Sequence, residues 1–499
     1  MREQLMATAF PIVPVAKAPM GRTPAKLIDG AAGAIPRADP PSATRAARIL
    51  VLGGGFGGIA AVRRLEHLFG SRPDVEITLV SRDNFFVITP LLFEACSGRL
   101  ELRHCAQPIR PALRRARFVE ATVTSVDADR RVVRAVGPND GTYELPYDQL
   151  IVALGATTNE VLIPGSEAAL TFKTMTDALV LRNHLIERLE RADAAITAAA
   201  RRRCLTVVVV GGGLVGVELL GELTAFAGDV LRYYPRIRRE ELRFHLFEAG
   251  PRILPEIDAK LADISLRVLR GRGADIRVST PVRAIEPERL HLSYESIDAG
   301  TIVLVAGIVP SAVAAAFPVE HDRRGRIVVN QAMRSLSHPT IWALGDCGAI
   351  PGPDGEPYPA LAQHAIREAR RLAENVAAVV DERAPAPFVL RSLGTMASLG
   401  HAQAVARVFG VRLTGFPAWW VRRTYYLFQM PRWDRRLRIM LDWTVALFFR
   451  PDITKVDIAT EQVQMRDERA SSTRRSGGYI AEQANFAKGD ADTRTKARA

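Results

Sequence analysis

The chain has 499 residues, of which 48% are hydrophobic, and this length is enough for two or three domains with ordinary cores. Its formal net charge is +13, but the arginines are spread along the chain without helix-turn-helix or zinc-finger spacing, so nucleic acid is the least favoured anionic partner. No run of about 18 uncharged apolar residues occurs, which predicts that no helix spans a membrane.

The cysteine pattern argues against a disulfide framework and against a redox-active pair. None of the four cysteines stands in a C-x-x-C or C-x-x-x-x-C arrangement, and their density is low. This usage favours a reducing, cytoplasmic setting. The cysteines are Cys96, Cys105, Cys204 and Cys347.

Two terminal segments lack the hydrophobic periodicity of folded elements. Residues 1–47 are rich in alanine and proline with scattered basic residues, and residues 457–499 are polar. Segments of this composition bury too little apolar surface to offset the entropy lost on ordering. We therefore expect a disordered arm and a disordered tail on either side of the folded part.

The first predicted strand, Ile49–Leu52, leads into a glycine-rich turn and then a helical pattern that continues to about Phe69. In the spacing G-x-G-x-x-G, the first glycine permits the tight turn and the second lets a pyrophosphate approach the backbone. The third lets the helix pack on the strand. The helix N-terminus also offers unpaired N–H groups to the phosphates. The dinucleotide-binding residues predicted here are Gly53, Gly55, Phe56 and Gly58.

A second copy of this plan follows later, where the apolar strand Thr206–Val210 precedes another G-x-G-x-x-G turn and a helix. A glycine-rich turn without a ligand is the alternative interpretation of either motif. Two copies, each between a strand and a helix, favour two dinucleotide sites, which suggests one bound flavin and one exchanging nicotinamide. The glycines of the second turn are Gly211, Gly213 and Gly216.

The residue that ends the strand after each glycine turn commonly binds the adenosine ribose. After Val75–Val80 this residue is Ser81, which bonds a hydroxyl more weakly than a carboxylate does. After the second motif it is Glu248, whose carboxylate would favour NADH because it repels the 2′-phosphate of NADPH. Arg252 lies close enough in sequence to reduce this preference, and a surface acid without a ligand is the alternative.

Further strand ends carry small or acidic residues. Gly155 and Gly307 each follow a buried strand and would let the backbone approach a cofactor closely. Asp346 follows the strand in Thr340–Cys347 and could accept hydrogen bonds from a sugar chain, although an Asx turn is the alternative.

Glu218 stands two residues after Gly216, in the first turn of the second motif's helix. A carboxylate there could orient a nicotinamide or relay a proton. The alternative is an acid that only complements the helix dipole.

Residues 412–451 differ in composition from the rest of the chain. They hold four of the five tryptophans among many arginines. Aromatic rings favour the headgroup level of a bilayer and arginines attract anionic lipid, so we expect this segment to lie on a membrane. A dimer interface, where the same residue types are enriched, is the alternative. The residues concerned are Trp419, Trp420, Trp433, Trp443, Arg422, Arg423, Arg432, Arg435, Arg436 and Arg438.

An ordered series of motifs is more specific than any one of them. The series is GGGFGG at 53–58, SRDNFFVITPLL at 81–92, YDQLIVALGATTN at 147–159, GGGLVGVELLGEL at 211–223, FEAGPRILP at 247–255, ALGDC at 343–347, ALAQHAIRE at 360–368 and LGTMASLGHAQAV at 393–405. In this order the motifs resemble those of the type II NADH dehydrogenases, the single-subunit NADH:quinone oxidoreductases, over about residues 48–456.

This resemblance implies an α/β fold with two Rossmann-like dinucleotide-binding domains and a C-terminal amphipathic region that associates with a membrane. The FAD-binding domain would consist of residues 48–170 and 308–388. The NADH-binding domain, residues 171–307, would be inserted within it, and the membrane-associating region would be residues 389–456.

The resemblance also implies roles for individual residues. FAD would bind at the first glycine turn with Asp346 on its ribityl chain, and NADH at the second turn with Glu248, while Glu218 would lie beside the flavin. The family's quinone site carries an A-Q-x-A-x-Q pattern, in which Gln363 is present here but Arg367 replaces the last glutamine. We expect Gln363 and Arg367 to bind the quinone carbonyls, and the reaction needs no metal.

The implied reaction passes electrons from NADH through FAD to a membrane quinone without proton pumping. It would take place on the cytoplasmic face of the inner (plasma) membrane, with a homodimer as a further option. One alternative is a sulfide:quinone oxidoreductase, for which Cys96 and Cys347 are the candidate redox cysteines. Others are a soluble NADH-dependent flavoprotein reductase, which leaves residues 412–451 unexplained, and a redox sensor that keeps both dinucleotides.

Overall fold

A computed structural model describes residues 47–70, 72–159, 161–390, 394–430 and 433–456. The predicted tail, and the predicted arm apart from Ala47, lie outside these ranges. Among the described residues no helix has both the length and the apolar character that crossing a bilayer requires.

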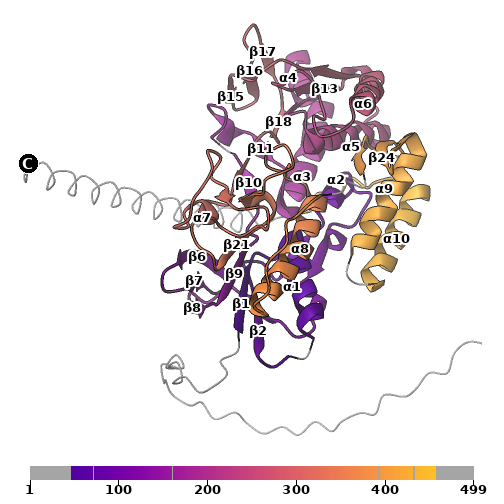
Figure 1. The fold of residues 1–499 in the computed structure, drawn as a ribbon. Helices are drawn as coiled ribbons and strands as arrows, with labels where there is room; N and C mark the ends of the chain where they lie inside the picture. The colour runs from indigo at the N-terminus through magenta and orange to yellow at the C-terminus, as the bar shows by residue number, and fades with distance from the viewer. Residues whose placement is uncertain (1–46, 71, 160, 391–393, 431–432, 457–499) are drawn as a thin grey trace, which may run out of the picture. The chain divides into compact units, whose positions relative to one another are not determined.

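The first of two five-stranded sheets has the order β21-β9-β1-β2-β5, and every pair in it is parallel (Figure 1). Its central strand β1 carries the apolar run of the first motif, and residues 49–52 are buried, as a parallel strand covered on both faces requires. Helix α1 (Phe56–Phe69) follows and packs on α8 (Ala362–Val380). The strands are β1 (Ala47–Leu52), β2 (Val75–Ser81), β5 (Arg117–Glu120), β9 (Gln149–Val152) and β21 (Ile341–Ala343).

The second sheet has the order β11-β18-β12-β13-β14 and is also wholly parallel. Its central strand β12 carries the second motif and leads into α5 (Leu214–Val230). Together the two sheets confirm the predicted α/β class. The other elements here are β11 (Leu170–Thr171), β12 (Thr206–Val210), β13 (Arg243–Phe247), β14 (Ala274–Arg277), β18 (Thr301–Leu304), α3 (Met175–Asp193), α4 (Ala198–Cys204) and α6 (Ala259–Gly271).

Smaller elements join and flank these sheets. Three-stranded antiparallel sheets are formed by β6 (Thr122–Asp127), β7 (Val132–Val136) and β8 (Thr142–Pro146), and by β15 (Ala284–Glu286), β16 (Arg289–His291) and β17 (Ser296–Asp298). Strand pairs are β3 (Phe85–Val87) with β4 (Ala106–Pro108), β10 (Ala156–Thr158) with β19 (Ile308–Pro310), and β20 (Ile327–Val328) with β22 (Gly348–Ala349). Short helices are α2 (Leu92–Cys96) and α7 (Ala312–Ala315).

The C-terminal part forms an antiparallel sheet followed by two helices. The sheet consists of β23 (Gly394–Ser398), β24 (Ala404–Val408) and β25 (Val411–Thr414), and the helices are α9 (Gly415–Gln429) and α10 (Trp433–Phe448). This sheet packs on α5, α6 and α9 (Figure 1). At the contact with α5, Gly221 and Gly400 meet backbone to backbone, since a Cβ on Gly400 would lie 2.2 Å from the Gly221 carbonyl oxygen.

Candidate functional site

The first glycine turn is a cradle of bare backbone at the N-terminus of α1. A Cβ on Gly53 would lie 2.2 Å from the Ala153 carbonyl oxygen, and one on Gly58 would lie 1.8 Å from the Gly53 carbonyl oxygen. By contrast, no atom lies within 4 Å of a Cβ built on Gly55, which caps the helix without a side-chain hydrogen bond. The turn therefore excludes side chains from its own packing and leaves space at the helix end, an arrangement that fits a pyrophosphate.

Two predicted residues lie around this cradle. The Oγ of Ser81 would be 2.6 Å from a Cβ on Gly54, so Ser81 lies directly against the turn. Asp346 follows β21, and burial raises the pKa of its carboxyl while the charge of nearby Lys173 lowers it. Burial likewise lowers the pKa of Lys173, and Asp346 raises it. Lys173 was missed in the sequence because an isolated lysine before a helix carries no local signal.

The second glycine turn repeats this geometry. A Cβ on Gly216 would lie 1.9 Å from the Gly211 carbonyl oxygen, and Gly211 has a positive φ of 115°. The Glu248 carboxylate closes the turn by accepting the backbone N–H of Gly212 at 2.5 Å and of Gly250 at 2.7 Å. The structure thus places Glu248 at the second glycine turn.

Arg252, which could have weakened the effect of Glu248, is engaged elsewhere. Its guanidinium donates to the Ile257 carbonyl oxygen at 3.1 Å and to the Pro255 carbonyl oxygen at 2.6 Å. These bonds direct its charge to backbone carbonyl groups of the following loop.

Gly155 and Gly307 each precede one strand of an antiparallel pair. Both have positive φ angles, 66° and 70°. The strands that follow them, β10 and β19, pair with Ala156 opposite Pro310. Because the pair is antiparallel, the two glycines lie at its opposite ends, where Ser311 donates to the Gly155 carbonyl oxygen and Asn159 donates to the Gly307 carbonyl oxygen.

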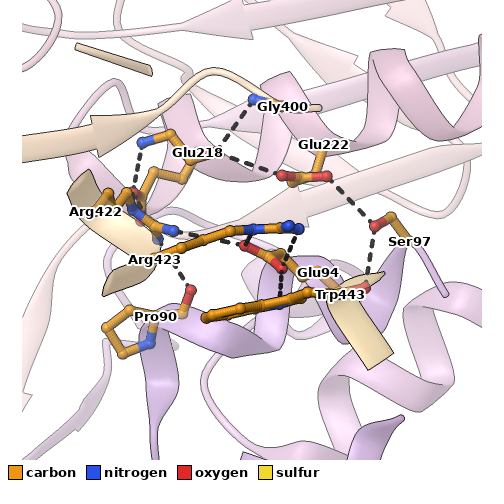
Figure 2. A network of polar contacts seen from close by, with 10 residues as sticks. Pro90, Glu94, Ser97, Glu218, Glu222, Gly400, Arg422, Arg423 and Trp443 are labelled. Carbon is orange, nitrogen blue, oxygen red and sulfur yellow. Dashed lines mark hydrogen bonds and ion pairs between the residues drawn. The ribbon is translucent and has the colours of Figure 1, made fainter. Parts of the chain in front are cut away.

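Glu218 is buried in an ion pair rather than exposed at the helix end. Its Oε1 accepts the backbone N–H of Ser398 at 2.7 Å and the Nε of Arg422 at 3.0 Å (Figure 2). Burial raises the pKa of Glu218, and the charge of Arg422 lowers it. This carboxyl is therefore fixed by the C-terminal part of the chain, from both β23 and α9.

A second buried carboxylate, Glu94 of α2, binds both C-terminal helices. Arg423 of α9 donates to its two oxygens at 3.2 and 2.8 Å, and the indole N–H of Trp443 of α10 donates at 2.8 Å (Figure 2). The Arg423 guanidinium also lies 3.7 Å from the ring centroid of Trp419 and 4.7 Å from that of Trp443. Glu94 is an acid within a short apolar helix, and this feature of the sequence could have indicated a buried ion pair.

These contacts correct part of the prediction for residues 412–451. We expected Arg422, Arg423, Trp419 and Trp443 to face lipid, but all four are buried, Arg422 to 1% exposure. The amphipathic pattern was misleading because the carboxylates that pair with the arginines lie in distant parts of the chain. These residues hold the helices on the protein instead.

Gln363 and Arg367 lie one turn apart on α8 and contact each other. Arg367 donates to the backbone oxygen of Gln363 at 3.0 Å and to its side-chain oxygen at 3.4 Å. The amide nitrogen of Gln363 donates to the Gly394 carbonyl oxygen at 3.2 Å. Strand β23 thus begins at the residue that binds Gln363 and ends at Ser398, which binds Glu218, so it connects these two parts of the site.

Three of the four cysteines, Cys96, Cys105 and Cys347, are buried, and Cys204 is half-buried. All four are free. Burial raises the pKa of Cys96 to about 12 and that of Cys347 to about 11. A thiol attacks or transfers electrons as its thiolate, so these values oppose the sulfide-oxidising alternative.

The sequence was also compared with known protein families and with individual proteins. Residues 47–369 match the pyridine nucleotide-disulphide oxidoreductase family. The type II NADH:quinone oxidoreductase Ndh of Mycobacterium tuberculosis is 30% identical, over 82% of this chain and 89% of that protein. A probable NADH dehydrogenase of Dictyostelium discoideum is 28% identical, over 82% of this chain and 91% of that protein.

A solved structure with a similar fold supports the sequence comparison. NDH2 from Plasmodium falciparum, solved in complex with NADH, superposes with a TM-score of 0.75 at 21% identity, covering 82% of this chain and all of that one. The sequence match over most of both chains and the shared fold lead to one assignment. The chain belongs to the pyridine nucleotide-disulphide oxidoreductase family and, within it, to the type II NADH:quinone oxidoreductases.

Proposed function

We propose that the chain oxidises NADH and reduces a membrane quinone with bound FAD, without pumping protons. The observation that carries the proposal is the pair of bare glycine turns, each between a parallel strand and a helix, with Ser81 against the first turn and Glu248 at the second. FAD, when bound, supplies a ring that accepts a hydride and passes electrons on singly or in pairs. The two Rossmann-like domains, with the boundaries given above, remain predictions.

The residues around the first turn are proposed to hold FAD. Backbone N–H groups at the start of α1 bind its phosphates, Ser81 bonds a ribose hydroxyl, and Asp346 accepts bonds from the ribityl chain. Burial raises the pKa of Asp346, and the charge of Lys173 opposes this rise. The remaining contacts are proposed for Gly53, Gly55, Phe56, Gly58 and Gly155.

The residues around the second turn are proposed to hold NADH. Gly211, Gly213 and Gly216 leave the backbone open to the pyrophosphate, and Gly307 lets the chain approach the nicotinamide end. Glu248 bonds the ribose hydroxyls and repels a 2′-phosphate, which favours NADH over NADPH.

The quinone is proposed to bind where α8, β23 and α9 meet. Gln363 and Arg367 present an amide and a guanidinium to its carbonyl oxygens. A guanidinium stabilises the charge that develops on a carbonyl oxygen during reduction, so Arg367 can serve where the family has glutamine. Glu218 positions the nicotinamide or relays a proton.

An anaerobic titration tests this function. NADH should bleach the flavin absorbance near 450 nm, NADPH should bleach it weakly, and a soluble short-chain quinone should restore it rapidly. Bleaching by sulfide and not by NADH would instead favour the sulfide:quinone alternative. Rapid bleaching by NADH with very slow recovery in every quinone tested would favour a redox sensor.

We further propose that the exposed face of α9 and α10 binds an anionic membrane surface peripherally, on the cytoplasmic side. Large apolar side chains gather on these two helices and just beyond them, while Arg438 and Arg450 add exposed positive charge. A patch of this kind marks a membrane or protein interface. The exposed apolar residues are Phe416, Trp420, Phe428, Trp433, Leu437, Met440, Leu441, Val445, Leu447, Phe448 and Phe449.

Placing a charge on this face should abolish membrane binding. The double substitution Leu441→Glu with Phe448→Glu should leave the protein unbound when it is floated with anionic liposomes, because two carboxylates would have to be buried at the lipid interface. The matched control is Tyr294→Glu, which charges an aromatic residue that is 99% exposed elsewhere and should float like the wild type. A dimer interface would instead give flotation unchanged and a dimer that dissociates in light scattering.

A further inference from the structure

We propose that Glu256 sets the affinity of the second glycine turn for NADH and NAD⁺, because its carboxylate lies beside the space where their pyrophosphate binds and repels it. This inference rests on the proposed function, since it extends the NADH site to a residue outside the glycine motif and the ribose-binding position. It accounts for a nucleotide that exchanges at the second turn while FAD stays bound at the first.

The two glycine turns differ at the position that faces the pyrophosphate. The second glycine of G-x-G-x-x-G lets the pyrophosphate approach the backbone, so a Cβ built there points into the phosphate space. At the first turn this glycine is Gly55, and apart from its chain neighbours no described atom lies within 4 Å of such a Cβ. At the second turn it is Gly213, and the Oε1 of Glu256 lies 3.7 Å from the Cβ position. The second phosphate space is therefore bordered by a carboxylate.

The start of α5 attracts both groups. Gly213 precedes this helix without a side-chain hydrogen bond, and its first turn contains no acid. The free N–H groups and the positive end of the helix dipole favour any anion that approaches them. Glu256 therefore competes with the pyrophosphate for the end of α5 and also repels it.

The loop between β13 and α6 holds Glu256 at this place. The backbone N–H of Leu254 donates to the Gly212 carbonyl oxygen at 2.8 Å, which joins the loop to the glycine turn. Leu254 and Ile257 are buried, whereas Glu256 between them is exposed. The buried residues fix the backbone, and the exposed carboxylate can rotate into solvent when a nucleotide binds.

Arg252 fixes the same loop at the two residues that flank Glu256. Its guanidinium donates to the carbonyl oxygens of Pro255 at 2.6 Å and of Ile257 at 3.1 Å. Both terminal nitrogens of the guanidinium take part in these bonds. Arg252 thus holds the backbone on either side of Glu256.

The charges around Glu256 oppose one another. Glu248 is stabilised by the two backbone N–H groups that it accepts, and Asp258 is paired with Arg412 at 2.8 Å. Partial burial and the charge of Glu248 raise the pKa of Glu256, while its own backbone N–H and the charge of Arg252 lower it. The negative charge of Glu256 is thus less compensated by the protein than that of Glu248 or Asp258.

Repulsion at this place lowers the affinity for every ligand that carries a pyrophosphate there. A pyrophosphate brings negative charge close to the carboxylate, and like charges a few ångströms apart repel strongly near a protein surface. NADH and NAD⁺ carry the same pyrophosphate, so Glu256 weakens the binding of both. The result is a higher KM for NADH and a faster release of NAD⁺.

A charge series at this position tests the inference on purified protein with FAD bound. Glu256→Gln should lower the dissociation constant of ADP-ribose about tenfold in titration calorimetry, and Glu256→Lys should lower it further. The difference between wild type and Glu256→Gln should shrink at high salt, because salt screens exposed charges. Adenosine, which lacks the pyrophosphate, should bind to the wild type and to both variants equally.

Kinetic measurements separate this effect on affinity from the chemistry. In Glu256→Gln the KM for NADH and the inhibition constant of NAD⁺ should both fall about tenfold, while flavin bleaching at saturating NADH should stay within about twofold of the wild-type rate. The matched control is Glu240→Gln, which removes an exposed acid elsewhere in the chain and should bind ADP-ribose like the wild type.

Each outcome decides the inference. Affinity for ADP-ribose that stays constant along the charge series would overturn it, and so would weaker binding in Glu256→Gln, which would make Glu256 a ligand of the nucleotide. Equal gains for ADP-ribose and adenosine would overturn it because the effect would not act through the pyrophosphate. If NADH bleaches the flavin in these cases, the proposed function stands. If no form of the protein binds ADP-ribose and NADH bleaches none of them, the proposed function fails as well.

Discussion

Glu94→Ala should destabilise the protein strongly and release its C-terminal helices. The substitution leaves the Arg423 guanidinium and the Trp443 indole N–H without their shared buried acceptor. Removing one partner of a buried ion pair costs about 3–5 kcal/mol, because the remaining charge stays out of water. We expect a lower midpoint of thermal unfolding and rapid proteolysis within α9 and α10, measured by calorimetry and by limited digestion.

The control for this prediction is an ion pair of similar length at the surface. Glu374 of α8 pairs with Arg64 of α1 at 2.8 Å, and each side chain is about one-third exposed. Glu374→Ala should cost about 0–1 kcal/mol, as exposed pairs do. If Glu94→Ala and Glu374→Ala lower the stability of the protein equally, burial does not increase the contribution of the Glu94 ion pair.

Gly58→Ala should yield a protein that has lost FAD. The added methyl group would lie 1.8 Å from the Gly53 carbonyl oxygen, so α1 must move away from the turn that ends β1. Overpacking of this kind costs about 1–3 kcal/mol, and here it also displaces the N–H groups proposed to bind phosphate. We expect more than a tenfold fall in the fraction of purified protein that carries flavin, measured by its absorbance.

Two other glycines separate folding from cofactor binding in this experiment. Gly271→Ala places a methyl group in open space at the end of α6 and should leave flavin content and stability near wild type or slightly higher. Gly55→Ala also meets no protein atom within 4 Å, so the fold should persist while the methyl group occupies the space proposed for pyrophosphate. Full flavin content in Gly55→Ala would argue against that placement.

The strand–turn–helix units could be predicted because their signals are local. The predicted first helix ends at Phe69, as observed, and the strand predicted over Val75–Val80 appears as β2 (Val75–Ser81). Glycine spacing, the apolar strand and the end of the strand all lie within about 40 residues of one another. The position of Glu248 at the second turn was predicted from an equally short stretch of sequence, and Glu248 lies at that turn in the structure.

The buried polar cluster could not be predicted in this way. Arg423 finds its partner Glu94 329 positions earlier in the chain, and Arg422 finds Glu218 204 positions earlier. Within α9 alone, two arginines between aromatic residues have the same pattern whether they face lipid headgroups or buried carboxylates. Only the packing of the C-terminal sheet against α5 decides between them.

The contact between Gly221 and Gly400 has a consequence for how this site can change in evolution. Where two main chains touch without intervening side chains, no rotamer change can widen or narrow the gap between them. The spacing between the backbone of α5 and the loop that follows β23 is therefore set at this point by main-chain contact. We expect apolar residues around this contact to be freely exchangeable, and the two glycines themselves to tolerate no larger residue.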